Sequence, residues 1–102
     1  MTEELRNKIF DELIAERTHQ HKRWGDENDD LYVSPWNWVT YVLSYSTGWP
    51  CGGHSANLPT EGVDDFRRSM VKVAALALAA IESIDRQRKV NGKTFYERDQ
   101  RL

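Results

Sequence analysis

Hydrophobic residues recur at helical spacing in the first part of the chain. Five of them fall on one stripe: Leu5, Ile9, Phe10, Leu13 and Ile14. Thr2 is a candidate N-cap that precedes two acidic residues, and Gly25 is a candidate helix terminator. The pattern predicts a helix from about residue 3 to residue 24. Its inward face turns from aliphatic to polar, because the stripe continues with Arg17, His21 and Trp24.

The middle of the chain predicts an acidic loop followed by a second helix. The stretch "DENDDLYV" is read as a loop, and Ser34-Pro35 then provides an N-cap and a proline at the first helical position. The segment "WNWVTYVLSY" is rich in β-branched and aromatic residues, which by propensity favour a strand. We predict a helix, because no second strand-like run is available to pair with it. Its stripe is Trp38, Val39, Val42 and Leu43, with Trp38 in the core.

Glycines and prolines from about Thr47 to Thr60 predict a loop before a third helix, which runs from about Glu61 to Asn91. Its predicted inner stripe is Phe66, Met70, Val73, Ala77, Ile81 and Ile84. The same helix is alanine-rich nearly all round, so we expect it to pack on two sides, one of them a partner subunit. The sequence therefore predicts an all-α fold of three main helices, completed by oligomerisation. Residues 1–90 form a single domain, and residues 91–102 form a polar, basic tail.

Composition narrows the class of protein. The chain has 102 residues and a formal net charge of −2, with fourteen basic and sixteen acidic residues, so we expect no nucleic-acid partner. One cysteine allows no internal disulfide, and no apolar run approaches the ~20 residues that span a bilayer. The start of the chain is charged, unlike a signal peptide. These features predict a cytoplasmic protein without a membrane partner.

The stretch "ERTHQHKRWGDEN" resembles a sequence motif of a known protein family. It is similar to the N-terminal motif of MazG-like proteins, which are all-α nucleoside triphosphate pyrophosphatases of phages and bacteria. Five residues match that motif: Glu16, Arg17, Gln20, Trp24 and Gly25. The later stretch "VKVAALALAAIESID" also resembles a helix of this family, so the likeness covers roughly residues 3–88.

The resemblance implies a homodimer or homotetramer whose members cleave nucleotides between the α and β phosphates with Mg²⁺. Family members hold the metal with acidic side chains on two helices. In this chain those places carry Tyr45, Ser46 and Trp49 on one helix, and Ser69 and Lys72 on the other. Neutral hydroxyl groups and a lysine do not replace carboxylates around Mg²⁺. We therefore expect no catalytic residues, no metal site and no cofactor here.

A binding role without hydrolysis is the leading hypothesis. Arg68 and Lys72 are spaced i, i+4 with Ser69 between them, and they could hold phosphate without metal. Aromatic side chains could stack on a base. The expected nucleotide-binding residues are Arg17, Gln20, His21, Trp24, Trp36, Tyr45, Trp49, Arg68, Ser69 and Lys72. The partner would be a nucleotide or a nucleotide-derived signal, sequestered by a phage-encoded anti-defence protein in the host cytoplasm.

Several other interpretations stay open. The chain could be a Mg²⁺-dependent pyrophosphohydrolase that uses other acids, or a protein-binding inhibitor module with an aromatic loop. The acids in question are Glu16, Glu61, Asp64 and Asp65. Arg68 and Lys72 could be a solvated helix face, and Arg17 with Gln20 could form an internal ion pair or cap. A zinc site is disfavoured because two of its candidate ligands point to different helix faces. Those candidates are His19, His21, Cys51 and His54.

Overall fold

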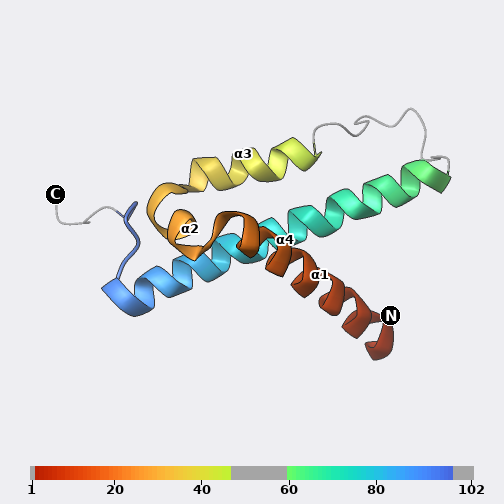
Figure 1. The fold of residues 1–102 in the computed structure, drawn as a ribbon, viewed down its shortest axis with the longest axis horizontal. Helices are drawn as coiled ribbons and strands as arrows, with labels where there is room; N and C mark the ends of the chain where they lie inside the picture. Colours follow the sequence, from red (N-terminus) through yellow and green to blue (C-terminus); the bar gives the residue numbers. More distant parts are fainter. Residues whose placement is uncertain (1, 47–59, 98–102) are drawn as a thin grey trace.

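The computed structural model describes residues 2–46 and 60–97. Within these ranges the chain forms four helices and no strand, which confirms the predicted all-α fold (Figure 1). The helices are α1 (Glu3–Trp24), α2 (Asp26–Tyr32), α3 (Pro35–Ser46) and α4 (Thr60–Asn91). The predicted loop from Thr47 to Pro59 lies outside the described residues.

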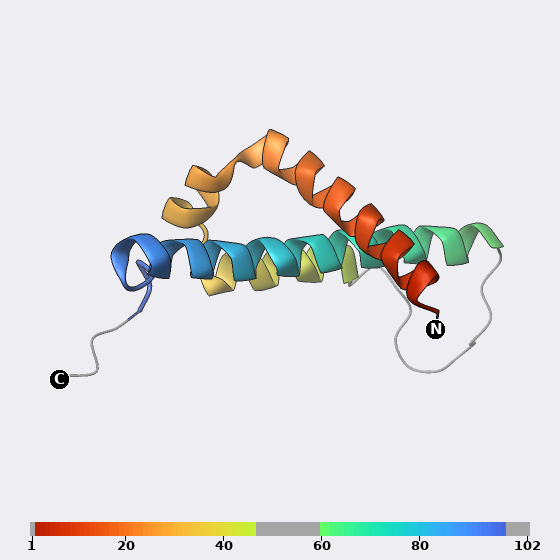
Figure 2. The same cartoon turned by 90° about the horizontal axis from the view of Figure 1, so that it is seen from below.

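The 32-residue helix α4 is the axis of the molecule. It contacts each of the other three helices, whereas α1 and α3 do not contact each other. Two views show α1 crossing α4 at an angle and α3 lying along a different side of it, antiparallel (Figures 1 and 2). Helix α4 therefore contributes residues to the hollows that form between it and the other described helices.

The helix ends follow the predicted capping chemistry. The Leu5 backbone N–H donates to Thr2 Oγ1 at 3.2 Å, which caps α1. Gly25 takes a φ of 79°, a left-handed value that glycine adopts at little cost, and its N–H donates to the His21 carbonyl oxygen at 2.8 Å. At the start of α3, the Asn37 side-chain oxygen accepts hydrogen bonds from both the backbone N–H and the hydroxyl of Ser34.

The acidic stretch after Gly25 is a helix, so the prediction of a loop was wrong. Acidic residues at a helix N-terminus interact favourably with the helix dipole. Two carboxylates of α2 also have cationic partners on other helices. Asp29 lies 3.6 Å from Arg17 Nη2, and Asp30 lies 2.7 Å from Arg86 Nη2. These long-range ion pairs could not be found from local sequence, and they fix α2 against α1 and α4.

The hydrophobic core is small and lies where α2, α3 and α4 meet. It consists of Val33, Trp38, Leu76 and Ala79, with partly buried residues packed around it. The burial of Trp38 confirms its predicted place in the core. Several large hydrophobic side chains of the predicted stripes are instead exposed, among them Leu5, Phe10, Ile14, Val39 and Leu43.

The predicted inner face of α1 is confirmed where it turns polar at Arg17, but it was wrong for part of the aliphatic stripe, because a polar face of that helix contacts the rest of the fold. Arg17 and Gln20 are buried, whereas Phe10 and Ile14 are more than half exposed. The predicted inner stripe of α4 was wrong in the same way. The side of α4 that contacts the other helices carries Ala75, Leu76, Ala79 and Ser83, and Phe66, Ala77 and Ile81 are exposed.

The segment after α4 folds back onto the end of that helix. The predicted stop at Asn91-Gly92 is confirmed, since α4 ends at Asn91 and Gly92 takes a φ of 79°. The Phe95 backbone N–H donates to Gln87 Oε1 at 3.1 Å, and Thr94 is buried. The first part of the basic tail therefore docks on its own helix. In the described ranges, no helix has the length and apolar character needed to cross a membrane.

The ion pair between Asp30 and Arg86 predicts a pH-dependent stability. Burial would raise the pKa of Asp30, but hydrogen bonds from Arg86 and Ser83 outweigh it and hold that pKa below its usual value. A lowered folded-state pKa stabilises the fold above the unfolded-state pKa of about 4, and this contribution is lost as the pH falls through the folded-state pKa.

We expect Asp30→Asn to lower the free energy of unfolding by about 2 kcal/mol at pH 7, because a charge-assisted hydrogen bond is lost. Urea denaturation at pH 7, 5, 3.5 and 2.5 should show the same gap at pH 7 and 5, and a gap that narrows below pH 4. Asp85→Asn, at an exposed position of α4 outside this ion pair, is the matched control and should change little. A gap that stays constant down to pH 2.5 would contradict the role given to Asp30.

Candidate functional site

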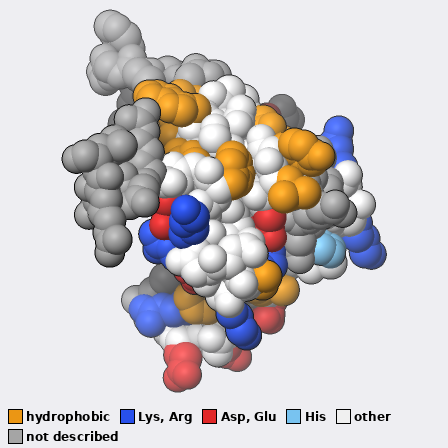
Figure 3. Space-filling view, turned by 90° about the vertical axis from the view of Figure 1, so that its left-hand side faces the viewer, with side chains coloured by type: hydrophobic (Ala, Val, Ile, Leu, Met, Phe, Trp, Pro, Cys, Tyr) orange, Lys and Arg blue, Asp and Glu red, His pale blue; other side chains and the backbone are white. Residues whose placement is uncertain are grey.

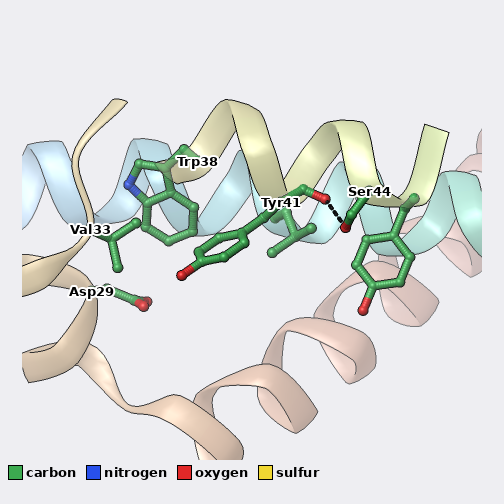
Figure 4. A pocket seen from close by; sticks show the side chains of 7 residues that line it. Asp29, Val33, Trp38, Tyr41 and Ser44 are labelled. Atoms are coloured by element: carbon green, nitrogen blue, oxygen red, sulfur yellow. Dashed lines mark hydrogen bonds between the residues drawn. The ribbon is translucent and has the colours of Figure 1, made fainter. Parts of the chain in front are cut away.

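A cavity of about 160 Å³ lies between α2, α3 and α4. Aromatic side chains from α3 form one wall, the apolar Leu76 of α4 forms another, and the Asp29 carboxylate of α2 lies at the floor (Figure 4). The lining residues are Asp29, Val33, Trp38, Tyr41, Ser44, Tyr45 and Leu76. An enclosed apolar space of roughly 150 Å³ can hold one benzene-sized ring. The cavity therefore has the size and lining to take one aromatic ring.

The geometry of α3 holds the aromatic wall in place. Trp38 and Tyr41 pack edge to face, with ring centroids 6.2 Å apart and planes at 90°. The Ser44 hydroxyl donates to the Tyr41 carbonyl oxygen at 2.7 Å (Figure 4), so it is held against its own helix. A ring that enters the cavity would meet aromatic faces and edges with few competing polar groups.

Arg17 and Asp29 connect the floor of the cavity to α1 and α4. Arg17 Nη2 lies 3.6 Å from Asp29 Oδ2, and Arg17 Nε lies 3.3 Å from Glu82 Oε2. The side chains of Arg17 and Asp29 are 8% and 10% exposed. Arg17 is thus an internal cation that positions the Asp29 carboxylate. An internal ion pair was the alternative to ligand contact that the sequence left open for Arg17.

A second hollow, of about 290 Å³, runs between α1 and α4. It is lined by Glu12, Ala15, Glu16, Arg68, Val71 and Lys72. The predicted pair Arg68 and Lys72 does share one surface, and two glutamates lie on the same surface. Arg68 also makes an ion pair with Asp65 on its own helix. This groove has mixed charge, and Arg68 already has an anionic partner.

Lys72 links the groove to the cavity. Its ammonium nitrogen lies 5.4 Å from the centre of the Tyr45 ring, a cation–π distance. In the described part of the chain, no carboxylate lies within ion-pair distance of this ammonium group. The structure therefore places a cation beside Tyr45, one of the aromatic residues that line the cavity.

Arg67, next to the predicted pair, has a different role. It donates two hydrogen bonds to the Glu12 carboxylate, at 2.6 and 2.7 Å, and ties α4 to α1. The hydrogen bond from Arg67 holds the pKa of Glu12 below its usual value, and the same contact raises the pKa of Arg67. Glu12 therefore stays charged at neutral pH, and the Arg67 guanidinium neutralises it.

The predicted site residues divide into three groups. Tyr45, Lys72 and Arg68 lie along the cavity and groove, and Ser69 is half-buried on the same helix. Arg17 and Gln20 are buried, His21 is exposed on α1, and Trp36 is 82% exposed on α3, outside the cavity lining. The side chain of Trp24 and the whole of Trp49 lie outside the described residues.

Sequence reasoning missed Asp29, Tyr41, Ser44 and Leu76 as lining residues. The sequence assigned Asp29 to a loop, whereas in the structure it belongs to α2, which places it beside the α3 residues that line the cavity. The i, i+3, i+4 and i+7 relation of Trp38, Tyr41, Val42 and Tyr45 was available in the sequence and would have marked one aromatic face.

The acids named for the enzyme alternative do not gather into one group. Glu16 lies in the groove on α1, and Asp64 and Asp65 are exposed on α4; the side chain of Glu61 is not described. Among the side chains that the structure describes, no three from His, Cys, Asp or Glu are grouped closely enough to hold a metal ion. Two of the discounted zinc candidates, Cys51 and His54, fall outside the described residues.

Compared with protein-family models, with curated proteins and with solved structures, the chain matches none. The resemblance to MazG-like proteins therefore stays a prediction.

Proposed function

We propose that this chain binds a nucleotide or a nucleotide-derived signal without hydrolysing it. One ring of the base would enter the cavity between Trp38, Tyr41 and Tyr45, and the phosphate would approach Lys72. The observation that carries the proposal is the position of Lys72, with its ammonium group 5.4 Å from the Tyr45 ring and no anionic partner in the described residues. A cation beside an aromatic slot suits a ligand that combines a flat ring with a phosphate.

The Asp29 carboxylate supports a base over a simple aromatic compound. It lies at the cavity floor and would accept a hydrogen bond from an exocyclic amino group or a ring N–H. Glu16 disfavours phosphate deep in the neighbouring groove, and Arg68 is paired with Asp65, so we place the phosphate at Lys72 with Arg68 beyond it. Sequestration of a signal, a phage anti-defence role and membership of the MazG-like family belong to the same proposal.

Thermal denaturation with a panel of mono-, di-, tri- and cyclic nucleotides, each with Mg²⁺ and with EDTA, tests this function. A ligand at a hundredfold excess over its Kd stabilises the fold by ~2.7 kcal/mol, which raises the Tm. We expect a shift that survives EDTA and a ligand recovered intact after denaturation. A shift that needs Mg²⁺, with cleaved product, would instead support the pyrophosphohydrolase.

The same ligand should lose about tenfold or more in affinity to the Tyr45→Ala variant, since stacking on one aromatic ring contributes ~1–3 kcal/mol. Lys72→Ala should cost a similar factor, through loss of a charge-assisted contact. Isothermal titration calorimetry measures both. Tyr32→Ala and Lys89→Ala are matched controls, because Tyr32 is 72% exposed on α2 and Lys89 is exposed in the last turn of α4. Equal losses in variants and controls would contradict the assigned site.

A protein-binding inhibitor module is the second candidate, and one observation favours it. The outer face of α3 carries Trp36, Val39 and Leu43 at helical spacing, 82%, 52% and 49% exposed. Such a ridge, with a tryptophan at one end, has the composition of a protein interface. No thermal shift with any nucleotide would favour this candidate.

A further inference from the structure

The acidic residue in the cavity lining, Asp29, bears on which base the cavity accepts. Figure 4 shows its carboxylate projecting from α2 toward the Tyr41 side chain, whose hydroxyl points back toward Asp29. Arg17 Nη2 lies 3.6 Å from Asp29 Oδ2 and holds the carboxylate in this position. The two oxygens of a carboxylate have about four acceptor positions, so a carboxylate that pairs with a neighbouring side chain still accepts hydrogen bonds from a ligand.

The low exposure of Asp29 makes this carboxylate selective. Its side chain is 10% exposed. The rest of the lining is aromatic or aliphatic apart from Ser44, whose hydroxyl is held by the Tyr41 carbonyl oxygen. A carboxylate with so little access to water favours a ligand that donates hydrogen bonds to it, and it disfavours a ligand that presents a lone pair instead.

Contacts outside the cavity do not distinguish one base from another. Lys72 would meet the phosphate, which all nucleotides share. On the end of the molecule that carries α2 and the last turns of α4, described side chains of both charge signs are interspersed, so this surface adds no attraction for one kind of nucleotide (Figure 3). The choice of base therefore depends on the edge that meets Asp29.

We propose that the cavity selects guanine, with Asp29 as the residue that determines this specificity; the inference rests on the nucleotide-binding function proposed above. The Watson–Crick edge of guanine carries two adjacent donors, a ring N–H and the exocyclic amino group. These two donors match the two oxygens of one carboxylate. The carbonyl oxygen of guanine lies next to the ring N–H and would accept a hydrogen bond from the Tyr41 hydroxyl, which lies on the Asp29 side of its ring (Figure 4).

The other bases present a poorer edge to a carboxylate. Adenine and cytosine each place a ring-nitrogen lone pair beside their amino group, so one carboxylate oxygen would face a second acceptor. Uracil has a single N–H between two carbonyl oxygens, which places an acceptor on each side of the donor. Guanine alone among the four offers two neighbouring donors to Asp29.

The dimensions of the site suit a purine that enters with this edge first. The edge belongs to the six-membered ring, and the cavity of about 160 Å³ has room for one such ring. The rest of the nucleotide would then extend along α3 from Tyr41 to Tyr45, about 6 Å at a rise of 1.5 Å per residue. Lys72 lies beside Tyr45, where the phosphate would follow the base and sugar.

Isothermal titration calorimetry of the full chain in EDTA tests the choice of base with ligands that share one triphosphate group: GTP, ITP, ATP, CTP and UTP. We expect GTP to bind roughly tenfold or more tightly than each of the others, the usual effect of a hydrogen bond to a charged group. ITP is the sharpest comparison, because inosine lacks only the exocyclic amino group of guanosine.

ITP or ATP that binds as tightly as GTP would overturn the choice of guanine and leave the proposed function standing. No binding of any of the five would also overturn it, and the thermal panel with other phosphate groups would then decide the proposed function separately.

Asp29→Asn tests the residue itself, because an amide replaces one acceptor by a donor. Xanthine has a carbonyl oxygen where guanine has its amino group, so we expect this variant to bind XTP more tightly than GTP, the reverse of the wild-type order. Asp30→Asn is the matched control, because Asp30 pairs with Arg86 and lies outside the cavity lining. It loses an ion pair of its own and should keep the wild-type order.

An Asp29→Asn variant that is folded by circular dichroism and still prefers GTP to XTP would overturn the role of Asp29. If this variant does not fold, the comparison of GTP with ITP on the wild-type chain still decides whether the cavity selects guanine.

Discussion

An Arg17→Met variant is expected to lose about 3–5 kcal/mol of its free energy of unfolding, because removing one member of a buried ion pair leaves the other charge uncompensated. Arg17 lies between Asp29 of α2 and Glu82 of α4, so a single side chain of α1 neutralises carboxylates from two other helices. Methionine keeps most of the volume and the helix propensity, which isolates the charge. A domain of this size has only about 5–15 kcal/mol of stability, so the loss would be a large part of the total.

Arg67→Met is the matched control for Arg17→Met. It also removes an arginine that joins α1 and α4 through a carboxylate, but the side chains of Arg67 and Glu12 are 53% and 41% exposed. Exposed ion pairs contribute about 0–1 kcal/mol, so urea denaturation should separate the two variants clearly. The double variant Arg17→Met, Asp29→Asn should recover part of the loss, because the stranded carboxylate is gone. Equal costs at Arg17 and Arg67 would show that Arg17 is not the internal cation described above.

Local capping chemistry explains why the helix ends could be predicted. The cap at Thr2, the stop at Gly25, the start at Pro35 and the stop near Asn91 each depend on contacts within a few residues. The acidic segment was misassigned for the opposite reason. Asp29 and Asp30 are held by arginines 12 and 56 residues away in sequence, and no local pattern contains that information.

The faces of α1 and α4 could not be predicted because hydrophobicity does not say which apolar surface a single chain buries. On α1, the chain buries Arg17 and Gln20 in preference to Phe10 and Ile14. The polar contact is fixed by ion pairs to α2 and α4, whose partners become neighbours only in the fold.

The candidate site likewise combines residues that the sequence pointed to with residues that only the fold brings together. Tyr45, Arg68 and Lys72 were named from a resemblance and a charge pattern, and the structure places all three along the cavity and groove. The neighbouring carboxylates Glu12 and Glu16 could not be anticipated, since they come from another helix. Glu16, together with the ion pair between Arg68 and Asp65, favours Lys72 over Arg68 as the phosphate contact.

Trp38→Ala is expected to lose about 3–5 kcal/mol, the usual cost of removing a large aromatic side chain from a core. Trp38 is 7% exposed and packs with Val33, Leu76 and Ala79, so one substitution removes much of the small apolar core. The buried indole N–H has no hydrogen-bond partner in the described residues, so Trp38→Phe should cost far less than Trp38→Ala.

Trp36→Ala provides the control, two residues away on the same helix and 82% exposed. Substitutions at such exposed sites usually change stability by no more than about 0.5 kcal/mol. Urea denaturation followed by circular dichroism would compare the two variants without relying on tryptophan fluorescence. If Trp38→Ala and Trp36→Ala lowered the free energy of unfolding equally, the core would not lie under α3. If Trp38→Ala alone unfolds, the cavity wall and the fold depend on one side chain, and ligand binding should be tested with Trp38→Phe.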